Sequence, residues 1–96
     1  MSTDPTGFDP DRAYRRSPRV ALRPEPFGAL AYDFGTRKLS FLKTPTLVTV
    51  VRTLEEEPSV HAALDAAAVP AAERPAYLTA LAGLADAGTI EPRESL

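Results

Sequence analysis

The stretch that most constrains the fold runs from Pro26 to Lys43 and holds two short runs of β-prone residues. These runs, Ala29–Tyr32 and Lys38–Leu42, flank a short connection that contains Gly35. Two β-prone runs separated by a short glycine-containing loop predict a β-hairpin, with Gly35 at the positive-φ position that reverses the chain. A small sheet of this kind must bury one face against other elements of the chain.

The residues before the hairpin predict a third strand, Ser17–Arg23, with its apolar side chains on one face. The segment Pro24-Glu25-Pro26 is expected to break the ladder after it, because two prolines remove two backbone donors. Alternation in the last strand places Leu39 and Phe41 on one side. That side is apolar enough to be core, so we expect both residues to face the interior.

Three helical patterns follow the hairpin. Thr44 and Pro45 predict the start of the first helix, Ser59 caps the second, Pro75 lies in the first turn of the third, and Gly88 stops it. Apolar residues recur in each helix at the spacing of a buried helical face. The predicted faces are Leu47, Val50, Val51 and Leu54 in the first helix; Val60, Leu64 and Ala68 in the second; and Tyr77, Leu78, Leu81, Leu84 and Ala85 in the third.

This order of elements predicts an α+β fold that is winged helix-turn-helix-like, with a three-stranded antiparallel sheet followed by three helices. We place the domain at residues 17–91, including a short extended piece at Thr89–Glu91. Residues 1–16 have few large apolar side chains and are expected to be a flexible N-terminal tail, with Phe8 and Tyr14 as its only candidate anchors. Residues 92–96 are expected to fray.

Composition argues against catalysis and against a metal or other cofactor. The 96 residues include no Cys and one His, so the usual nucleophile–base pairs and zinc ligand sets are missing. His61 lies off the apolar stripe of its helix and is expected to be solvated. No apolar run approaches the ~20 residues that span a bilayer, which favours a cytoplasmic protein without a membrane partner.

The charge distribution argues against a nucleic-acid partner. The third helix has almost none of the Arg, Lys, Asn or Gln side chains that read base edges, and the isoelectric point is about 5.3. Charge is nevertheless segregated: residues 12–52 carry nine Arg or Lys and two acidic residues, whereas residues 55–96 carry eight acidic residues and two Arg. The halves can attract each other, or the basic half can attract an acidic partner.

The edge strand Lys38–Leu42 is the strongest candidate for a binding site. Its flanking cations, Arg37, Lys38 and Lys43, fit two interpretations. Charges on an edge strand discourage aggregation. The same edge can also accept an extended peptide as an additional strand, with the third helix as the opposite wall and Tyr77 among its apolar contacts.

At these residues the chain resembles a known family. The segments RPEPFGALAYDFG (Arg23–Gly35), RKLSFLK (Arg37–Lys43) and LAGLADAGTI (Leu81–Ile90) are similar to the peptide chaperones of mycofactocin biosynthesis. These are recognition elements for ribosomally made, modified peptides (RiPP recognition elements), similar to the peptide chaperone of pyrroloquinoline quinone biosynthesis.

The resemblance implies that the chain binds the leader of a precursor peptide along the third strand and the third helix. It also implies delivery of that peptide to a radical S-adenosylmethionine (SAM) maturase. An acidic leader would suit the basic side chains. The implied peptide-binding residues are Arg37, Lys38, Leu39, Ser40, Phe41, Leu42, Lys43, Arg74, Tyr77, Leu78, Leu81 and Leu84. Spacing does not settle which of them face the peptide and which the core. The alternative is a winged-helix protein–protein interaction module or transcription factor.

Overall fold

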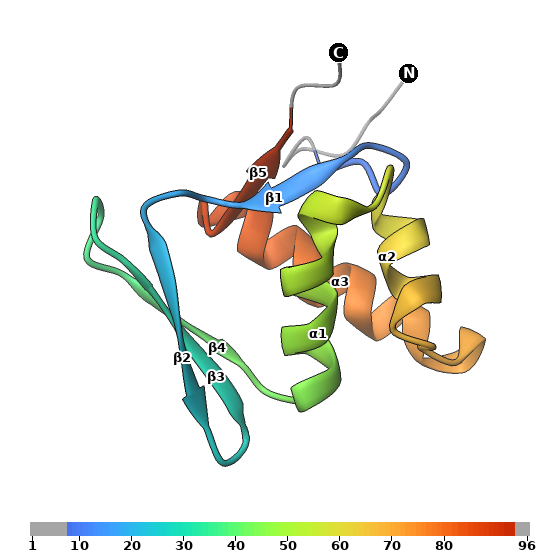
Figure 1. Ribbon diagram of the computed structural model, residues 1–96, viewed down its shortest axis with the longest axis horizontal. Coiled ribbons are helices and arrows are strands. Elements are labelled where there is room, and N and C mark those ends of the chain that lie inside the picture. The colour runs from blue at the N-terminus through green and yellow to red at the C-terminus, as the bar shows by residue number, and fades with distance from the viewer. Residues whose placement is uncertain (1–7, 94–96) are drawn as a thin grey trace.

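Two small antiparallel sheets and three α-helices make up residues 8–93, the part of the chain that the computed structural model describes (Figure 1). One sheet has the order β2-β3-β4 and the other pairs β1 with β5. No helix in the described part is long and apolar enough to cross a membrane. The strands are β1 (Tyr14–Arg16), β2 (Val20–Glu25), β3 (Gly28–Asp33), β4 (Leu39–Leu42) and β5 (Ile90–Pro92); the α-helices are α1 (Pro45–Thr53), α2 (Val60–Ala66) and α3 (Arg74–Asp86); short 3-10 turns, η1 (Leu54–Glu56) and η2 (Ala71–Glu73), precede α2 and α3.

The predicted hairpin is confirmed as part of the three-stranded sheet, but two predictions about its strand ends and loop are wrong. β2 continues through Pro24, which pairs with Ala29, so the prolines do not break the ladder. Pro24 is tolerated because β2 is an edge strand. In the loop between β3 and β4, the residue with positive φ is Arg37, at 63°, and not Gly35. The side chain of Arg19 lies against Gly35, where an added Cβ would approach Arg19 Cδ to 2.7 Å.

The face of the sheet that packs against the helices carries mostly small side chains. It is the opposite face from the one predicted to be buried. Ala29, Ala31 and Leu42 are buried, whereas Leu39 and Phe41 are 56% and 57% exposed. The prediction that Leu39 and Phe41 belong to the core is therefore wrong. Helix α1 packs directly against β3, and alanines on the inner face of β3 allow this close approach.

The helices begin where the caps predict. The Thr44 hydroxyl accepts a hydrogen bond from the amide of Leu47 at 3.0 Å, and the Ser59 hydroxyl accepts one from Ala62 at 3.0 Å. Gly88, with φ of 80°, ends the α3 segment as predicted. The second helix is shorter than its apolar pattern suggests, because α2 ends at Ala66 and Ala68 is exposed.

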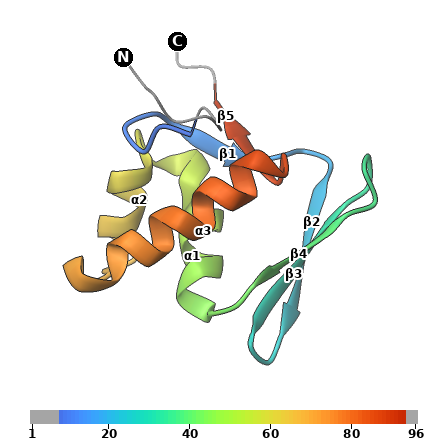
Figure 2. The same ribbon diagram turned by 180° about the vertical axis from the view of Figure 1, so that it is seen from behind.

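The chain before residue 17 is part of the folded body, so the expected tail must be corrected for residues 8–16; residues 1–7 lie outside the described part. Phe8 and Tyr14 are buried, with ring centroids 5.2 Å apart. Strand β1, near the start of the chain, pairs with β5, near its end, and the two strands lie side by side in Figures 1 and 2. Arg93 is also held, because its amide donates to the carbonyl of Ala13 at 2.9 Å. The expected fraying at 92–96 therefore fails for residues 92 and 93, while 94–96 lie outside the described part.

Candidate functional site

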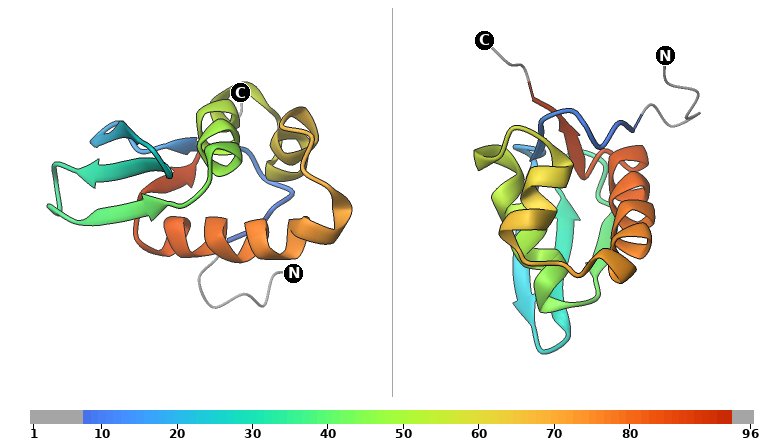
Figure 3. Two further views of the ribbon diagram at one scale, coloured as in Figure 1. Left: turned by 90° about the horizontal axis from the view of Figure 1, so that it is seen from below. Right: turned by 90° about the vertical axis from the view of Figure 1, so that its right-hand side faces the viewer.

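Strand β4 leaves one backbone edge open. It pairs with β3 on one side, from Ala29↔Leu42 to Tyr32↔Leu39, and no described strand pairs with its other side. An edge strand presents a row of backbone N–H and C=O groups that can pair with another chain. Figure 3 shows that this side of β4 is next to α3.

A groove lies where β4 runs into α1 and faces α3. Its volume is about 410 Å³, and one wall comes from a single face of α3, on which Ala76, Ala80 and Leu84 are spaced four residues apart. The Thr44 hydroxyl and the Tyr77 phenol approach to 3.4 Å across it. The lining is mostly apolar and consists of Phe41, Lys43, Thr44, Leu47, Ala76, Tyr77, Ala80 and Leu84.

The predicted site residues take three kinds of position: in the groove lining, along the open edge of β4, or away from both, and some residues of β4 have more than one. Phe41, Lys43, Tyr77 and Leu84 line the groove, and Leu39 to Leu42 supply the open strand edge. Other side chains are directed elsewhere: those of Leu42 and Leu81 are buried in the core, and Leu78 packs partly against it. Arg74 is engaged away from the groove, with Asp65 at 2.7 Å and the carbonyl of Val69 at 3.0 Å.

Four lining residues were missed from the sequence: Thr44, Leu47, Ala76 and Ala80. Thr44 and Leu47 were interpreted only as a helix cap and a core residue, and they have those roles as well. The alanines carry a signal that sequence analysis could have used. They precede Leu84 at intervals of four on a helix that also carries Tyr77, which describes a face of small residues beside large ones.

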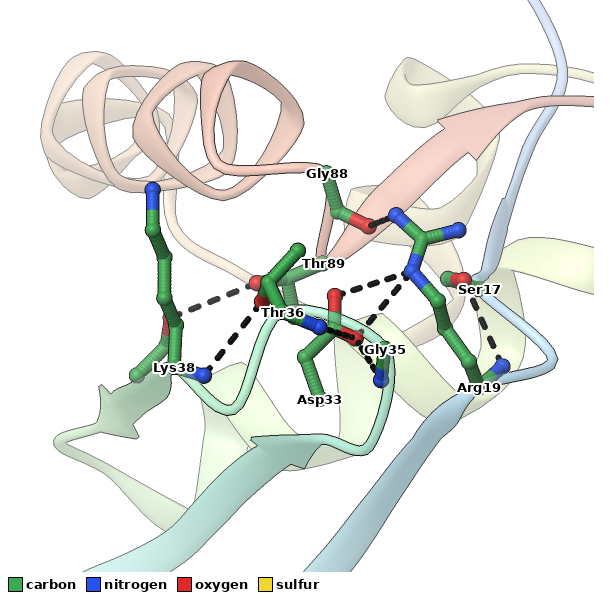
Figure 4. A network of polar contacts seen from close by, with 9 residues as sticks. Ser17, Arg19, Asp33, Gly35, Thr36, Lys38, Gly88 and Thr89 are labelled. Carbon is green, nitrogen blue, oxygen red and sulfur yellow. Dashed lines mark hydrogen bonds and ion pairs between the residues drawn. The ribbon is translucent and has the colours of Figure 1, made fainter.

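A polar network fixes the loop at the far end of β4 (Figure 4). The buried Asp33 carboxylate accepts hydrogen bonds from the amides of Gly35 and Thr36 at 2.8 and 3.0 Å, and from Arg19 Nε at 3.0 Å. Burial raises the pKa of the Asp33 carboxyl, but these amide hydrogen bonds and the Arg19 guanidinium outweigh burial and hold the pKa below its ordinary value.

A second contact connects β4 to the end of α3. The hydroxyls of Ser40 and Thr89 lie 3.2 Å apart, and the Arg19 guanidinium also donates to the carbonyl of Gly88 at 3.4 Å. The open edge is therefore attached at one end to the α3–β5 connection and at the other to the start of α1. A rigid edge costs less entropy when it receives a partner strand.

Three cations beside the open edge have no anionic partner. Arg37, Lys38 and Lys43 are exposed and make no ion pair with any described residue, whereas Arg19 and Arg23 are paired with Asp33 and Glu25. The edge and the groove therefore present uncompensated positive charge. An incoming segment with carboxylates would meet favourable charge along its length.

The described residues offer no metal centre, since no three potential ligand side chains gather. The single histidine, His61, lies on α2, with its Nε2 3.6 Å from a carboxylate oxygen of Asp11. Its backbone amide donates to the carbonyl of Pro10. His61 thus holds the N-terminal segment against α2.

An open strand edge beside an apolar groove, bordered by free cations, is the arrangement found in domains that bind peptides by strand addition. The chain belongs to the peptide chaperone MftB family, whose model matches residues 13–91. This family membership confirms the resemblance predicted from the sequence.

Three relatives are about half identical to the chain. The peptide chaperone MftB of Mycobacterium tuberculosis is 50% identical over 92 residues, which are 96% of this chain and 84% of the relative. That of Mycobacterium ulcerans is 53% identical over 88 residues, 92% of this chain and 81% of the relative. That of Mycolicibacterium smegmatis is 51% identical over 85 residues, 88% and 83% of the two chains. A comparison with solved structures gave no match.

Proposed function

We propose that the chain is a non-catalytic chaperone that binds the leader of a mycofactocin precursor peptide by strand addition. In this proposal the leader pairs with the open edge of β4 and places apolar side chains in the groove against α3. The domain acts as a winged helix-turn-helix-like scaffold whose third helix recognises a peptide. The observation that carries the proposal is the open edge of β4 beside the 410 Å³ apolar groove.

The edge alone gives a weak complex, so the groove must contribute. The four residues of β4 can form only a few ladder hydrogen bonds, each contributing about 0.5–1.5 kcal/mol net. Burying one leucine-sized side chain in the groove adds about 1.5–3 kcal/mol. Both are opposed by the entropy of association. Affinity and sequence selectivity therefore depend on the apolar side chains that reach Tyr77 and Leu84.

The free cations favour a leader with Asp or Glu beside its apolar residues. Exposed charge pairs contribute about 0.2–1 kcal/mol each and are screened by salt. Lys38→Glu should therefore weaken leader binding about two- to fivefold without changing the fold, and affinity should decrease as salt increases. Affinity that does not depend on salt would contradict the electrostatic part of the proposal.

The chaperone would deliver the bound peptide to a radical SAM maturase. A domain that holds the leader and also contacts the enzyme raises the effective concentration of the precursor at the enzyme, which increases occupancy without any chemistry of its own. Membership of a peptide chaperone family supports this role.

The test is a titration of a synthetic leader peptide into variants that fill the groove. Ala76 is exposed and lines the groove, so Ala76→Phe should reduce leader affinity at least tenfold. The matched control is Ala66→Phe on α2, an exposed alanine outside the groove, which should bind as the wild type does. Equal affinity of both variants for the leader would refute the proposal that the leader occupies the groove. Strand addition would be refuted if the NMR amide shifts of Leu39–Leu42 stayed unchanged with excess leader.

A further inference from the structure

The outer face of the β2–β3–β4 sheet, turned away from the helices, is apolar and has no covering element. Among the described residues, the large apolar side chains that are most exposed to solvent all belong to this sheet or its turns: Phe27, Phe34, Leu39 and Phe41, at 40%, 65%, 56% and 57% exposure. Figures 1 and 2 show that the two turns of the sheet project beyond the helices. Elsewhere in the described part, large apolar side chains are buried or partly covered.

Strand register joins these side chains into one patch. Leu30 lies opposite Phe41, and Tyr32 lies opposite Leu39, on the face away from the buried alanines. Phe27 stacks on Phe41 with ring centroids 6.0 Å apart, and Phe34 meets the Tyr32 ring edge-on at 4.7 Å. The patch therefore crosses the sheet from one turn to the other. A contiguous apolar patch of this kind marks an interaction surface, and aromatic side chains are the residues enriched at the centres of protein interfaces.

The charges around the patch identify the chemistry of its partner. Arg23 lies beside Leu30 on this face but is paired with Glu25 at 3.1 Å. The uncompensated charges are therefore the unpaired Arg37, Lys38 and Lys43, which border the patch at β4. A second copy of the chain stacked on the same face would bring cations against cations, which is unfavourable. An anionic membrane would attract these cations but repel the acidic helical half, and the whole chain carries a net charge of −2. The patch therefore fits a protein surface with an apolar centre and an acidic rim.

We propose that this outer sheet face is the docking surface for the enzyme that modifies the peptide, and that the enzyme presents such an apolar, acid-rimmed surface. The identity of the partner rests on the function proposed above, whereas the patch and its charge do not. A strand added at the edge of β4 lies beside the outer face and leaves most of it uncovered, because ladder hydrogen bonds run in the plane of the sheet. Only Phe41 and Lys43, at the end of the face next to the groove, belong to both surfaces. Peptide and enzyme thus occupy adjoining surfaces and bind at the same time.

Two substitutions test the face without touching the groove or the edge of β4. Ala21 is exposed on β2, opposite Tyr32, and Phe34 is in the loop after β3. Ala21→Glu places an anion in the patch, and Phe34→Ser removes its most exposed ring. The matched control is Ala66→Glu on α2, which makes the same change on the far side of the helices. Each variant is titrated with the purified maturase and, separately, with the synthetic leader.

We expect Ala21→Glu and Phe34→Ser to reduce maturase affinity at least tenfold, with leader affinity within twofold of the wild type and Ala66→Glu unchanged. Saturating leader should not displace the enzyme. Maturase affinity within twofold of the wild type in both variants overturns the proposal, as does displacement by the leader. A wild-type chain that binds the maturase and fails to bind the leader would instead refute the proposed function alone.

The other possible occupants have their own readouts. A dimer that forms at high concentration and is abolished by Ala21→Glu would assign the face to a second copy of the chain. Sedimentation with vesicles rich in phosphatidylglycerol, lost in Phe34→Ser, would assign it to a membrane. Either result overturns the proposal of an enzyme docking surface.

Discussion

The orientation of the sheet can be tested by the same substitution at two positions of one strand. Leu42 and Leu39 both lie on β4, but the Leu42 side chain is fully buried and that of Leu39 is 56% exposed. Truncating a buried leucine to alanine costs about 2–5 kcal/mol, since it removes buried methyl groups and leaves a cavity. Truncating Leu39 removes a side chain that water already contacts over more than half of its surface. We therefore expect a cost of about 1 kcal/mol or less for Leu39→Ala.

Urea denaturation followed by circular dichroism measures both costs. A domain of this size has a stability of about 5–14 kcal/mol, so Leu39→Ala should still be folded in water, and Leu42→Ala should either unfold at a lower urea concentration or be unfolded without urea. With a urea m value of about 1 kcal/mol/M, a difference of ~2 kcal/mol separates the two unfolding midpoints by ~2 M. Equal midpoints would refute the face assignment. A greater loss in Leu39→Ala would restore the orientation predicted from the sequence, in which Leu39 and Phe41 are core residues.

Two further predictions concern other parts of the fold. Because the folded-state pKa of Asp33 lies below its unfolded value, the stability it contributes is present above about pH 4 and is lost as the pH falls through the folded-state pKa. Asp33→Asn should therefore lower the Tm at neutral pH, and its Tm should converge with that of the wild type in acid; a constant difference from neutral to strongly acidic pH would contradict this. Tyr14→Ala should cost about 3–5 kcal/mol by urea denaturation, because the ring is buried against Phe8. The exposed neighbour, Arg15→Ala, should cost about 1 kcal/mol or less, and similar effects of the two variants would show that residues 8–16 are not packed as described.

The sequence predicted the helices well because their signals are local. The Thr44 and Ser59 caps, the stripe from Leu47 to Leu54 and the Gly88 stop each depend on residues within one or two turns. The three-stranded sheet was also predictable, since alternation and a short loop define a hairpin locally. A groove between the third strand and the third helix was also expected, and the structure has a hollow there, whereas its use as a peptide site stays a prediction.

The misses share a physical cause: each depends on what packs against the segment rather than on the segment itself. Alternation shows that Leu39 and Phe41 share a face, but it does not show which face the helices cover. Helix α1 selects the face of β3 with Ala29 and Ala31, because small side chains permit close packing. Strand β1 has only three residues and a partner at the other end of the chain, so neither length nor periodicity could reveal it.

Strand β4 is part of the core and has two proposed binding tasks, and these three parts differ in direction. Inward side chains such as Leu42 form the core, the backbone edge is unpaired, and outward side chains such as Leu39 belong to the apolar patch. Phe41 on β4 both lines the groove and stacks on Phe27 in the patch, so a substitution there changes both surfaces at once. A Phe41 variant therefore cannot separate peptide binding from enzyme docking. Ala76 on α3 and Ala21 on β2 can, because each borders one surface and not the other.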